Sequence, residues 1–194
     1  MSKIFKSTKN TRPILKDSLR FIRSDVPTVI TEEEYRWLKD NNVLTIIDLR
    51  TAEERKQKPC PLENRNDFEY FHIPVTGGNA IPESVDEVAQ SYINMVDIEM
   101  DRIIEVILYA NTNVLYFCSA GKDRTGVVSA LLLKIFKYDI DYIIDDYVKS
   151  ADNLKDVLEG YAKNNPDVDI NIITPKKEYM EWFLKNEIIN YRRK

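Results

Sequence analysis

Five residues separate Cys118 from Arg124 in the run Cys-Ser-Ala-Gly-Lys-Asp-Arg-Thr-Gly. Apolar residues precede the run at 113–117 and follow it at 127–133, so a buried strand is predicted to turn here into a buried helix. The small residues 119–121 let the backbone curl tightly, and its N–H groups would then point inward as an anion-binding nest. The helix start adds unpaired N–H groups and the positive end of its dipole. The pattern is typical of a site that holds a phosphate dianion against a thiolate.

The side chains of this loop each have a use in such chemistry. Arg124 can donate two parallel N–H bonds to two phosphate oxygens, and the positive surroundings favour the thiolate of Cys118. The hydroxyl of Thr125 can donate to the sulfur. Asp123 is the candidate acid and base for the leaving group and the attacking water, and Lys122 could meet a second substrate phosphate. The predicted phosphate-binding residues are Ser119, Ala120, Gly121, Lys122, Asp123 and Arg124.

Each residue taken alone has an ordinary structural explanation. A cysteine at the end of an apolar strand is usually an inert small hydrophobe, and a charged residue at a helix start is usually solvated. The combination of Cys118 and Arg124 with Gly121, Thr125 and Gly126 at a strand-to-helix turn favours the phosphate site.

The loop resembles that of the atypical bacterial protein tyrosine phosphatases, whose members often also act on phosphoserine, phosphothreonine or phosphoinositides. Two further segments are similar to that family, one a strand ending in Asp-Leu-Arg and the other a helix with Asp-Tyr before a basic residue, Ser and Asn. These segments are residues 43–50 followed by Glu53 and Glu54, and residues 145–150 with Asn153. The resemblance covers roughly residues 40–155.

The resemblance implies a cysteine-phosphatase fold and hydrolysis through a phosphocysteine intermediate, with no metal or organic cofactor. By position, Cys118 matches the family's nucleophile, Arg124 its phosphate clamp and Asp123 its proposed acid and base. Lys122 matches the lysine associated with phosphoinositide activity. One position departs from the pattern, because Phe117 stands where family loops usually have histidine. That histidine supports the thiolate through hydrogen bonds, so we expect its loss to slow turnover without abolishing it.

Three polar residues elsewhere need separate interpretation. Asp48 ends a strand at the edge where open α/β sheets bind ligands, so it is a candidate supporting residue; a structural pairing with Arg50, Arg55 or nearby N–H groups stays open beside it. His72 is expected to be a satisfied strand-end residue, because one histidine makes neither a metal site nor a triad. Cys60 lies between two prolines and is expected to be incidental, with protection of the nucleophile from overoxidation as the alternative.

Composition sets limits on the class of protein. The chain has 194 residues, of which 43% are hydrophobic and 31% charged, which favours one domain over residues 1–194. A net charge of −4 argues against a nucleic-acid binder, and two cysteines exclude a disulfide scaffold. No apolar run approaches a membrane span or a secretory core, so a cytoplasmic location is the default, although the family implies exported relatives. The expected partner is a phosphoprotein or phosphoinositide substrate, without integral membrane association; the oligomeric state stays open.

Hydrophobic periodicity predicts an α/β fold with a central, mostly parallel sheet covered by helices. Strands are expected at 43–48, 68–75 and 113–118. Helices are expected after Thr31, over a long region from Ser84 to Asn111, from the loop to Lys137, over 140–149 and 154–161, and after Thr174 with Tyr179, Phe183 and Ile188. The region 76–100 is expected to present a solvated helix surface, with a mobile lid as the alternative.

Three functions remain at this point. The leading one is a cysteine-dependent phosphatase for phosphotyrosine, with phosphoserine, phosphothreonine or phosphoinositides as further substrates. Arsenate reduction and sulfur transfer share the oxyanion loop, but the first needs resolving cysteines close by and the second does not require Lys-Asp-Arg-Thr. A catalytically impaired phosphate-binding module is disfavoured by the intact Cys118, Asp123 and Arg124, although Phe117 is compatible with it.

Overall fold

A five-stranded sheet lies at the centre of the computed structural model, which describes residues 4–186. The strands stand in the order β1-β2-β5-β3-β4, and all neighbours are parallel except the short β1, which pairs antiparallel with β2. The mostly parallel sheet is therefore confirmed, with two N-terminal strands that the sequence pattern did not reveal. The strands are β1 (Arg12–Pro13), β2 (Phe21–Asp25), β3 (Val43–Asp48), β4 (Glu69–His72) and β5 (Asn113–Cys118).

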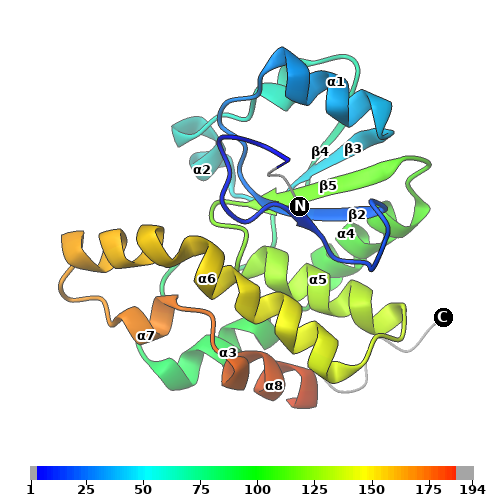
Figure 1. Cartoon of the computed structure of the whole chain (residues 1–194). Coiled ribbons are helices and arrows are strands. Elements are labelled where there is room, and N and C mark those ends of the chain that lie inside the picture. Colours follow the sequence, from blue (N-terminus) through cyan, green and yellow to red (C-terminus); the bar gives the residue numbers. More distant parts are fainter. Residues whose placement is uncertain (1–3, 187–194) are drawn as a thin grey trace.

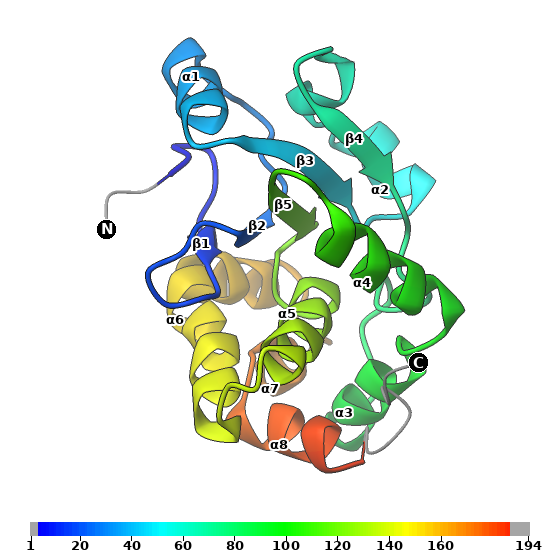
Figure 2. The same cartoon turned by 90° about the vertical axis from the view of Figure 1, so that its right-hand side faces the viewer.

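Two hydrophobic cores cover the two faces of the sheet. Because successive side chains of a strand point to opposite faces, β5 serves both: Tyr116 and Cys118 belong to the larger core, and Leu115 and Phe117 to the smaller one. Helices α3 to α8 lie on the side of the larger core, and α1 lies on the other side (Figures 1 and 2). The helices are α1 (Glu32–Asp40), α2 (Ala52–Gln57), α3 (Val85–Asn94), α4 (Ile98–Tyr109), α5 (Arg124–Ile135), α6 (Ile140–Asn164), α7 (Ile170–Ile173) and α8 (Lys177–Asn186), with a 3-10 turn at Pro61–Asn64.

Two helix predictions need correction. The region from Ser84 to Asn111 forms two helices, because a second helix start interrupts it at Asp97. The carboxylate of Asp97 caps α4 by accepting hydrogen bonds from the N–H groups of Glu99 and Met100, at 3.0 and 3.1 Å. The two helices expected over 140–149 and 154–161 are instead the single helix α6. Its polar interior residues Ser150 and Asn153 bind side chains of the N-terminal segment and do not compete for the helix backbone.

A short helix that the sequence pattern did not reveal follows the Asp-Leu-Arg strand. Helix α2 begins with a capping box, in which the Thr51 hydroxyl accepts from the Glu54 N–H and the Glu54 carboxylate accepts from the Thr51 N–H. The same box, with Thr31 and Glu34, starts α1 where it was predicted. In the last helix Tyr179 and Phe183 are buried; Ile188 lies outside the described residues.

Helix α3 packs one face against the larger core. Its residues Val88, Ala89 and Tyr92 are buried in the larger core, and its outer face carries the exposed Asp86 and Glu87. The expected solvated surface is present on that outer face. Between residues 4 and 186, none of the helices is long and apolar enough to cross a membrane.

Candidate active site

The predicted phosphate loop connects the end of β5 to the first turn of α5. Asp123 is the N-cap residue of α5, so the unpaired N–H groups of the first turn face the loop. Gly121 has a φ of +67°, and a Cβ there would lie 2.4 Å from the backbone oxygen of Ser24. Because any side chain would collide with the end of β2, only glycine allows the loop to pack this closely.

The guanidinium of Arg124 is held end-on by the carboxylate of Glu54, with two N–O distances of 2.6 Å. The hydroxyl of Ser119 donates to the same carboxylate at 2.5 Å. Arg124 Nε is buried and has no hydrogen-bond partner within residues 4–186. The side edge of the guanidinium, made by Nε and the second N–H of Nη2, therefore keeps two donors for phosphate oxygens.

The charges of Glu54 and Arg124 support one another. Burial opposes ionisation of Glu54, but hydrogen bonds from Arg124, Ser119 and the Thr51 N–H outweigh it and lower the pKa of Glu54 to about 2. Burial likewise opposes the charge of Arg124, but the hydrogen bonds to Glu54 and the electrostatic attraction of the nearby Cys118 raise the pKa of Arg124 above its usual value. The sequence placed Glu54 in a family-like segment but gave it no role.

The carboxylate of Asp123 is held at the rim of the loop from two sides. Tyr92 donates its hydroxyl to Oδ1 at 2.7 Å, and the ammonium of Lys122 lies 2.6 Å from Oδ2. Tyr92 also shares a 2.7 Å hydrogen bond with Tyr147. Burial, together with the negative charge of Asp123, raises the pKa of Tyr92 well above its usual value, so this phenol stays protonated as a donor.

Thr125 differs from the prediction. Its hydroxyl oxygen is buried and has no hydrogen-bond partner in the described part of the chain, so the expected bond to the sulfur of Cys118 is not made. The Thr125 side chain is fully enclosed at the start of α5. A buried hydroxyl without a partner is uncommon and costs free energy.

Asp48 pairs with neighbours of its own sheet edge and does not line the cavity over the loop. The guanidinium of Arg50 binds both its oxygens, at 2.9 and 2.6 Å, and the hydroxyl of Tyr70 donates at 2.6 Å. Of the two interpretations of Asp48, the structure contains the pairing with Arg50. Arg50 in turn stacks 5.4 Å from the ring of Phe117, which faces the smaller core, on the opposite side of the strand from Cys118.

The other two residues weighed from sequence lie away from the loop. Ring atom Nε2 of His72 is 2.8 Å from the backbone oxygen of Arg50, as expected of a satisfied strand-end histidine. Cys60 is a free thiol in the smaller core, whereas Cys118 belongs to the larger one. Burial raises the pKa of the Cys60 thiol to about 12.

A cavity of about 290 Å³ opens above the loop and brings Cys118, Asp123, Arg124 and Glu54 to one space. Its walls come from α3, α6, α7 and the segment before α3. They are largely apolar and include Ile81, Val88, Met95, Val157, Leu158 and Ile173. Within the described residues no group of three or more His, Cys, Asp or Glu side chains could hold a metal ion.

A family model described as the tyrosine phosphatase family matches residues 7–191. The chain belongs to the tyrosine phosphatase family. This confirms the resemblance drawn from the loop and its two companion segments. Membership extends over nearly the whole chain, including the N-terminal residues that pack behind the loop.

Two relatives in this family are named phosphatases. The tyrosine-protein phosphatase of Nostoc commune is 28% identical over 157 residues, which is 76% of this chain and 52% of that protein. The triple specificity protein phosphatase PtpB of Mycobacterium tuberculosis is 45% identical over 51 residues, 26% of this chain and 18% of that protein. The chain thus spans about half the length of the first relative and less of the second.

One solved structure shows the fold. It is the core catalytic domain of the PP-IP phosphatase SIW14 from S. cerevisiae in complex with citrate, with a TM-score of 0.50 and 17% identity. The match covers 92% of this chain and 88% of that one. At this identity the likeness supports the expected cysteine-phosphatase fold.

Replacing Glu54 by Gln should destabilise the protein in a pH-dependent way. The folded-state pKa of about 2 lies below the usual 4.5, so the carboxylate stabilises the fold above pH 4.5 and this contribution is lost as the pH falls toward 2. The difference in unfolding free energy between wild type and Glu54→Gln should be largest above about pH 5 and shrink at lower pH. Denaturant unfolding at several pH values measures it.

The matched control is Glu53→Gln. Glu53 is the exposed neighbour, with 69% of its side chain accessible and one distant ion pair with Lys56. The Glu53→Gln substitution should change the free energy of unfolding little at any pH. A Glu54→Gln deficit that stays constant across the pH range would contradict the ion-pair account.

Proposed function

We propose that this chain is a cysteine-dependent phosphatase that hydrolyses phosphotyrosine monoesters through a phosphocysteine intermediate. The observation that carries the proposal is the meeting of Cys118, Arg124 and Asp123 in one cavity, at the start of α5. There a nucleophile, a paired cation with donors left over and a carboxyl group surround one space beside the loop.

The reaction would run in two displacements. The phosphate oxygens accept from the loop N–H groups and from the free side edge of Arg124, while the thiolate of Cys118 attacks phosphorus. The bond from phosphorus to the ester oxygen breaks, and Asp123 gives that oxygen a proton. Water then attacks the phosphocysteine, Asp123 takes the proton back, and phosphate and the thiolate are released.

Asp123 must give up one of its two contacts to carry that proton. The Lys122 ammonium is the mobile one, since it sits on a flexible side chain, whereas Tyr92 is fixed in the core. We therefore assign Tyr92 the task of orienting Asp123, and Lys122 that of turning toward the substrate. Thr125 and Asp48 are proposed as supporting residues that do not touch the substrate. Thr125 lies at the start of α5, and Asp48 lies at the end of the strand that leads to α2.

The cavity favours an aromatic monoester over a substrate with several phosphates. Its apolar walls suit a phenyl ring, and the cations that line it, Lys122 and Arg124, are each paired with a carboxylate. A second phosphate would have to displace Asp123 from Lys122. Phosphoinositide hydrolysis, which the family resemblance attaches to Lys122, is therefore the second candidate, with phosphoserine and phosphothreonine as further substrates.

The remaining assignments follow the same proposal. We propose that residues 1–194 act as one phosphatase domain, without a metal or organic cofactor and with a phosphoprotein as the substrate partner. Arsenate reduction is disfavoured because Cys60 belongs to a different core from Cys118. The cytoplasmic location stays a prediction.

Replacing Cys118 by Ser should reduce hydrolysis of para-nitrophenyl phosphate to the uncatalysed background, because the alcohol is not ionised and cannot attack phosphorus. The control is Cys60→Ser, which removes the other thiol and should retain wild-type turnover. If the wild-type protein is inert but still binds phosphate, the impaired-module function is correct and the proposal fails.

Replacing Asp123 by Asn should slow poor leaving groups most. Nitrophenolate leaves without a proton, whereas phenolate or the tyrosine oxygen needs one. The value of kcat/KM, which excludes the later hydrolysis of the phosphocysteine, should therefore fall about a hundredfold or more for phenyl phosphate. The loss of kcat/KM for para-nitrophenyl phosphate, measured at the same pH, should be much smaller. Equal losses for both esters would move the acid to another group.

A substrate panel tests the aromatic preference. We expect kcat/KM for a phosphotyrosine peptide to exceed that for short-chain phosphatidylinositol phosphates by at least about tenfold. Lys122→Met should leave that order unchanged. A faster phosphoinositide reaction that is selectively lost in Lys122→Met would support the second candidate instead.

A further inference from the structure

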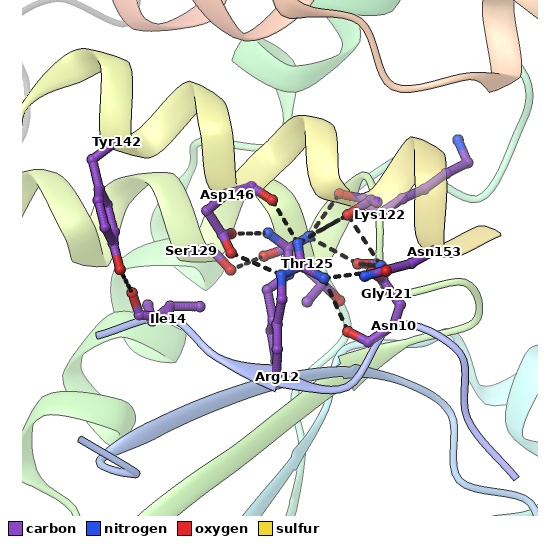
Figure 3. A network of polar contacts seen from close by, with 12 residues as sticks. Asn10, Arg12, Ile14, Gly121, Lys122, Thr125, Ser129, Tyr142, Asp146 and Asn153 are labelled. Atoms are coloured by element: carbon purple, nitrogen blue, oxygen red, sulfur yellow. Dashed lines mark hydrogen bonds and ion pairs between the residues drawn. The ribbon is translucent and has the colours of Figure 1, made fainter. Parts of the chain in front are cut away.

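The outer side of the phosphate loop is held from behind by two side chains of the N-terminal segment. Asn10 donates its Nδ2 hydrogens to the backbone oxygen of Gly121 at 2.7 Å and, more distantly, to that of Ala120 at 3.5 Å. Arg23 Nη2 donates to the oxygen of Gly121 at 2.9 Å and to that of Lys122 at 3.4 Å. Figure 3 shows Asn10 and Gly121 in this network, between the N-terminal strand and α6.

The direction of these carbonyl groups determines the direction of the loop amides. A trans peptide unit is planar, and its C=O and N–H bonds point to opposite sides; the described chain contains no cis peptide. With the carbonyls of residues 120–122 drawn outward, the N–H groups of residues 121–123 are turned toward the concave side. That is the side on which a phosphate over Cys118 would lie.

The two donors are fixed in turn by α6. Both oxygens of Asp146 are used, one by Arg23 Nη1 and the other by Arg12 Nε at 2.8 Å. The hydroxyl of Ser150 accepts from Asn10 at 3.1 Å, and Asn153 donates to the amide oxygen of Asn10 at 3.1 Å. Asn10 and Arg23 therefore have few other orientations open to them.

This network also leaves a positive charge behind the loop. Two guanidinium groups share the single carboxylate of Asp146, and Arg23 is fully buried. Burying a charge costs free energy unless the charge is paired and hydrogen-bonded. A charged donor also polarises the peptide group that it binds. Polarised peptides are stronger N–H donors toward an anion.

We propose that Arg23 and Asn10 are positioning residues of the anion site, which turn and polarise the loop amides so that they bind the substrate phosphate. The inference rests on the proposed function for its substrate. It concerns the affinity of the loop for an oxyanion, which can be measured without turnover.

The direct test is calorimetric titration of the full chain with tungstate, a phosphate-like oxyanion. Arg23→Met should weaken tungstate binding about tenfold or more, because a charged hydrogen bond to the loop is lost. Arg23→Lys keeps the charge and a donor, and should recover part of the affinity. Circular dichroism of each variant establishes that it is folded.

The matched control is Arg20→Met. Arg20 also binds backbone oxygens through its guanidinium, including those of Ile107, Leu108 and Ala110, but at the opposite end of the sheet. It should lower stability and leave tungstate affinity within about twofold of wild type. An equal loss of tungstate affinity in Arg20→Met would mean that general destabilisation of the fold explains the loss in Arg23→Met, and it would overturn the proposal.

A second variant covers the case in which Arg23→Met does not fold. Asn10→Asp keeps the shape and the acceptor that binds Asn153, but replaces the donor facing Gly121 with an acceptor. It should also weaken tungstate about tenfold or more. Wild-type affinity in either folded variant would overturn the inference. Wild-type protein that binds tungstate but never hydrolyses an ester would instead refute only the proposed function.

Discussion

A single carboxylate holds the buried guanidinium of Arg124, and the arrangement of the site depends on this pair. Glu54 reaches Arg124 from α2, binds Ser119 of the loop and also closes the first turn of its own helix. Helix α2 is thereby tied to the phosphate loop and to the start of α5, which lie some 65 to 70 residues further along the chain. The pairing is end-on, so the arginine stays oriented while its side edge keeps donors for substrate.

Paired charges also determine the character of the cavity. Each cation that lines it has a carboxylate partner, and the walls above are apolar. Under the proposed function, the dianion of an aromatic monoester would lie over the loop amides and its ring against the apolar walls. A polyphosphate would leave its further charges against apolar surface or against Asp123, at a cost in free energy.

The loop itself was predictable because its parts are contiguous. A strand, a tight turn with Gly121 and a helix start lie within one short run, and their local geometry follows from residue type. The mostly parallel sheet followed from the alternation of strands and helices. Two helix predictions needed correction. One depended on a single capping side chain, Asp97, and the other on a partner for Ser150 that comes from the other end of the chain.

What the sequence did not reveal are contacts across the chain. Glu54 acts on a residue 70 positions away, Tyr92 on one 31 positions away and Arg23 on one 98 positions away. No local pattern marks such partners, since each would read as an ordinary helix or strand residue. The predicted bond from Thr125 to the sulfur of Cys118 is local in sequence, yet it is absent from the described residues. Residue type and spacing alone do not determine how such a side chain packs.

The central claim is that the sulfur of Cys118 becomes bonded to phosphorus during turnover. Acid quenching of the working protein, followed by peptide mass spectrometry, tests it most directly. The account predicts a phosphorylated peptide that contains Cys118 and is absent before substrate is added. Phosphate on another side chain, or active turnover with no phosphorylated cysteine at any quench time, would contradict it.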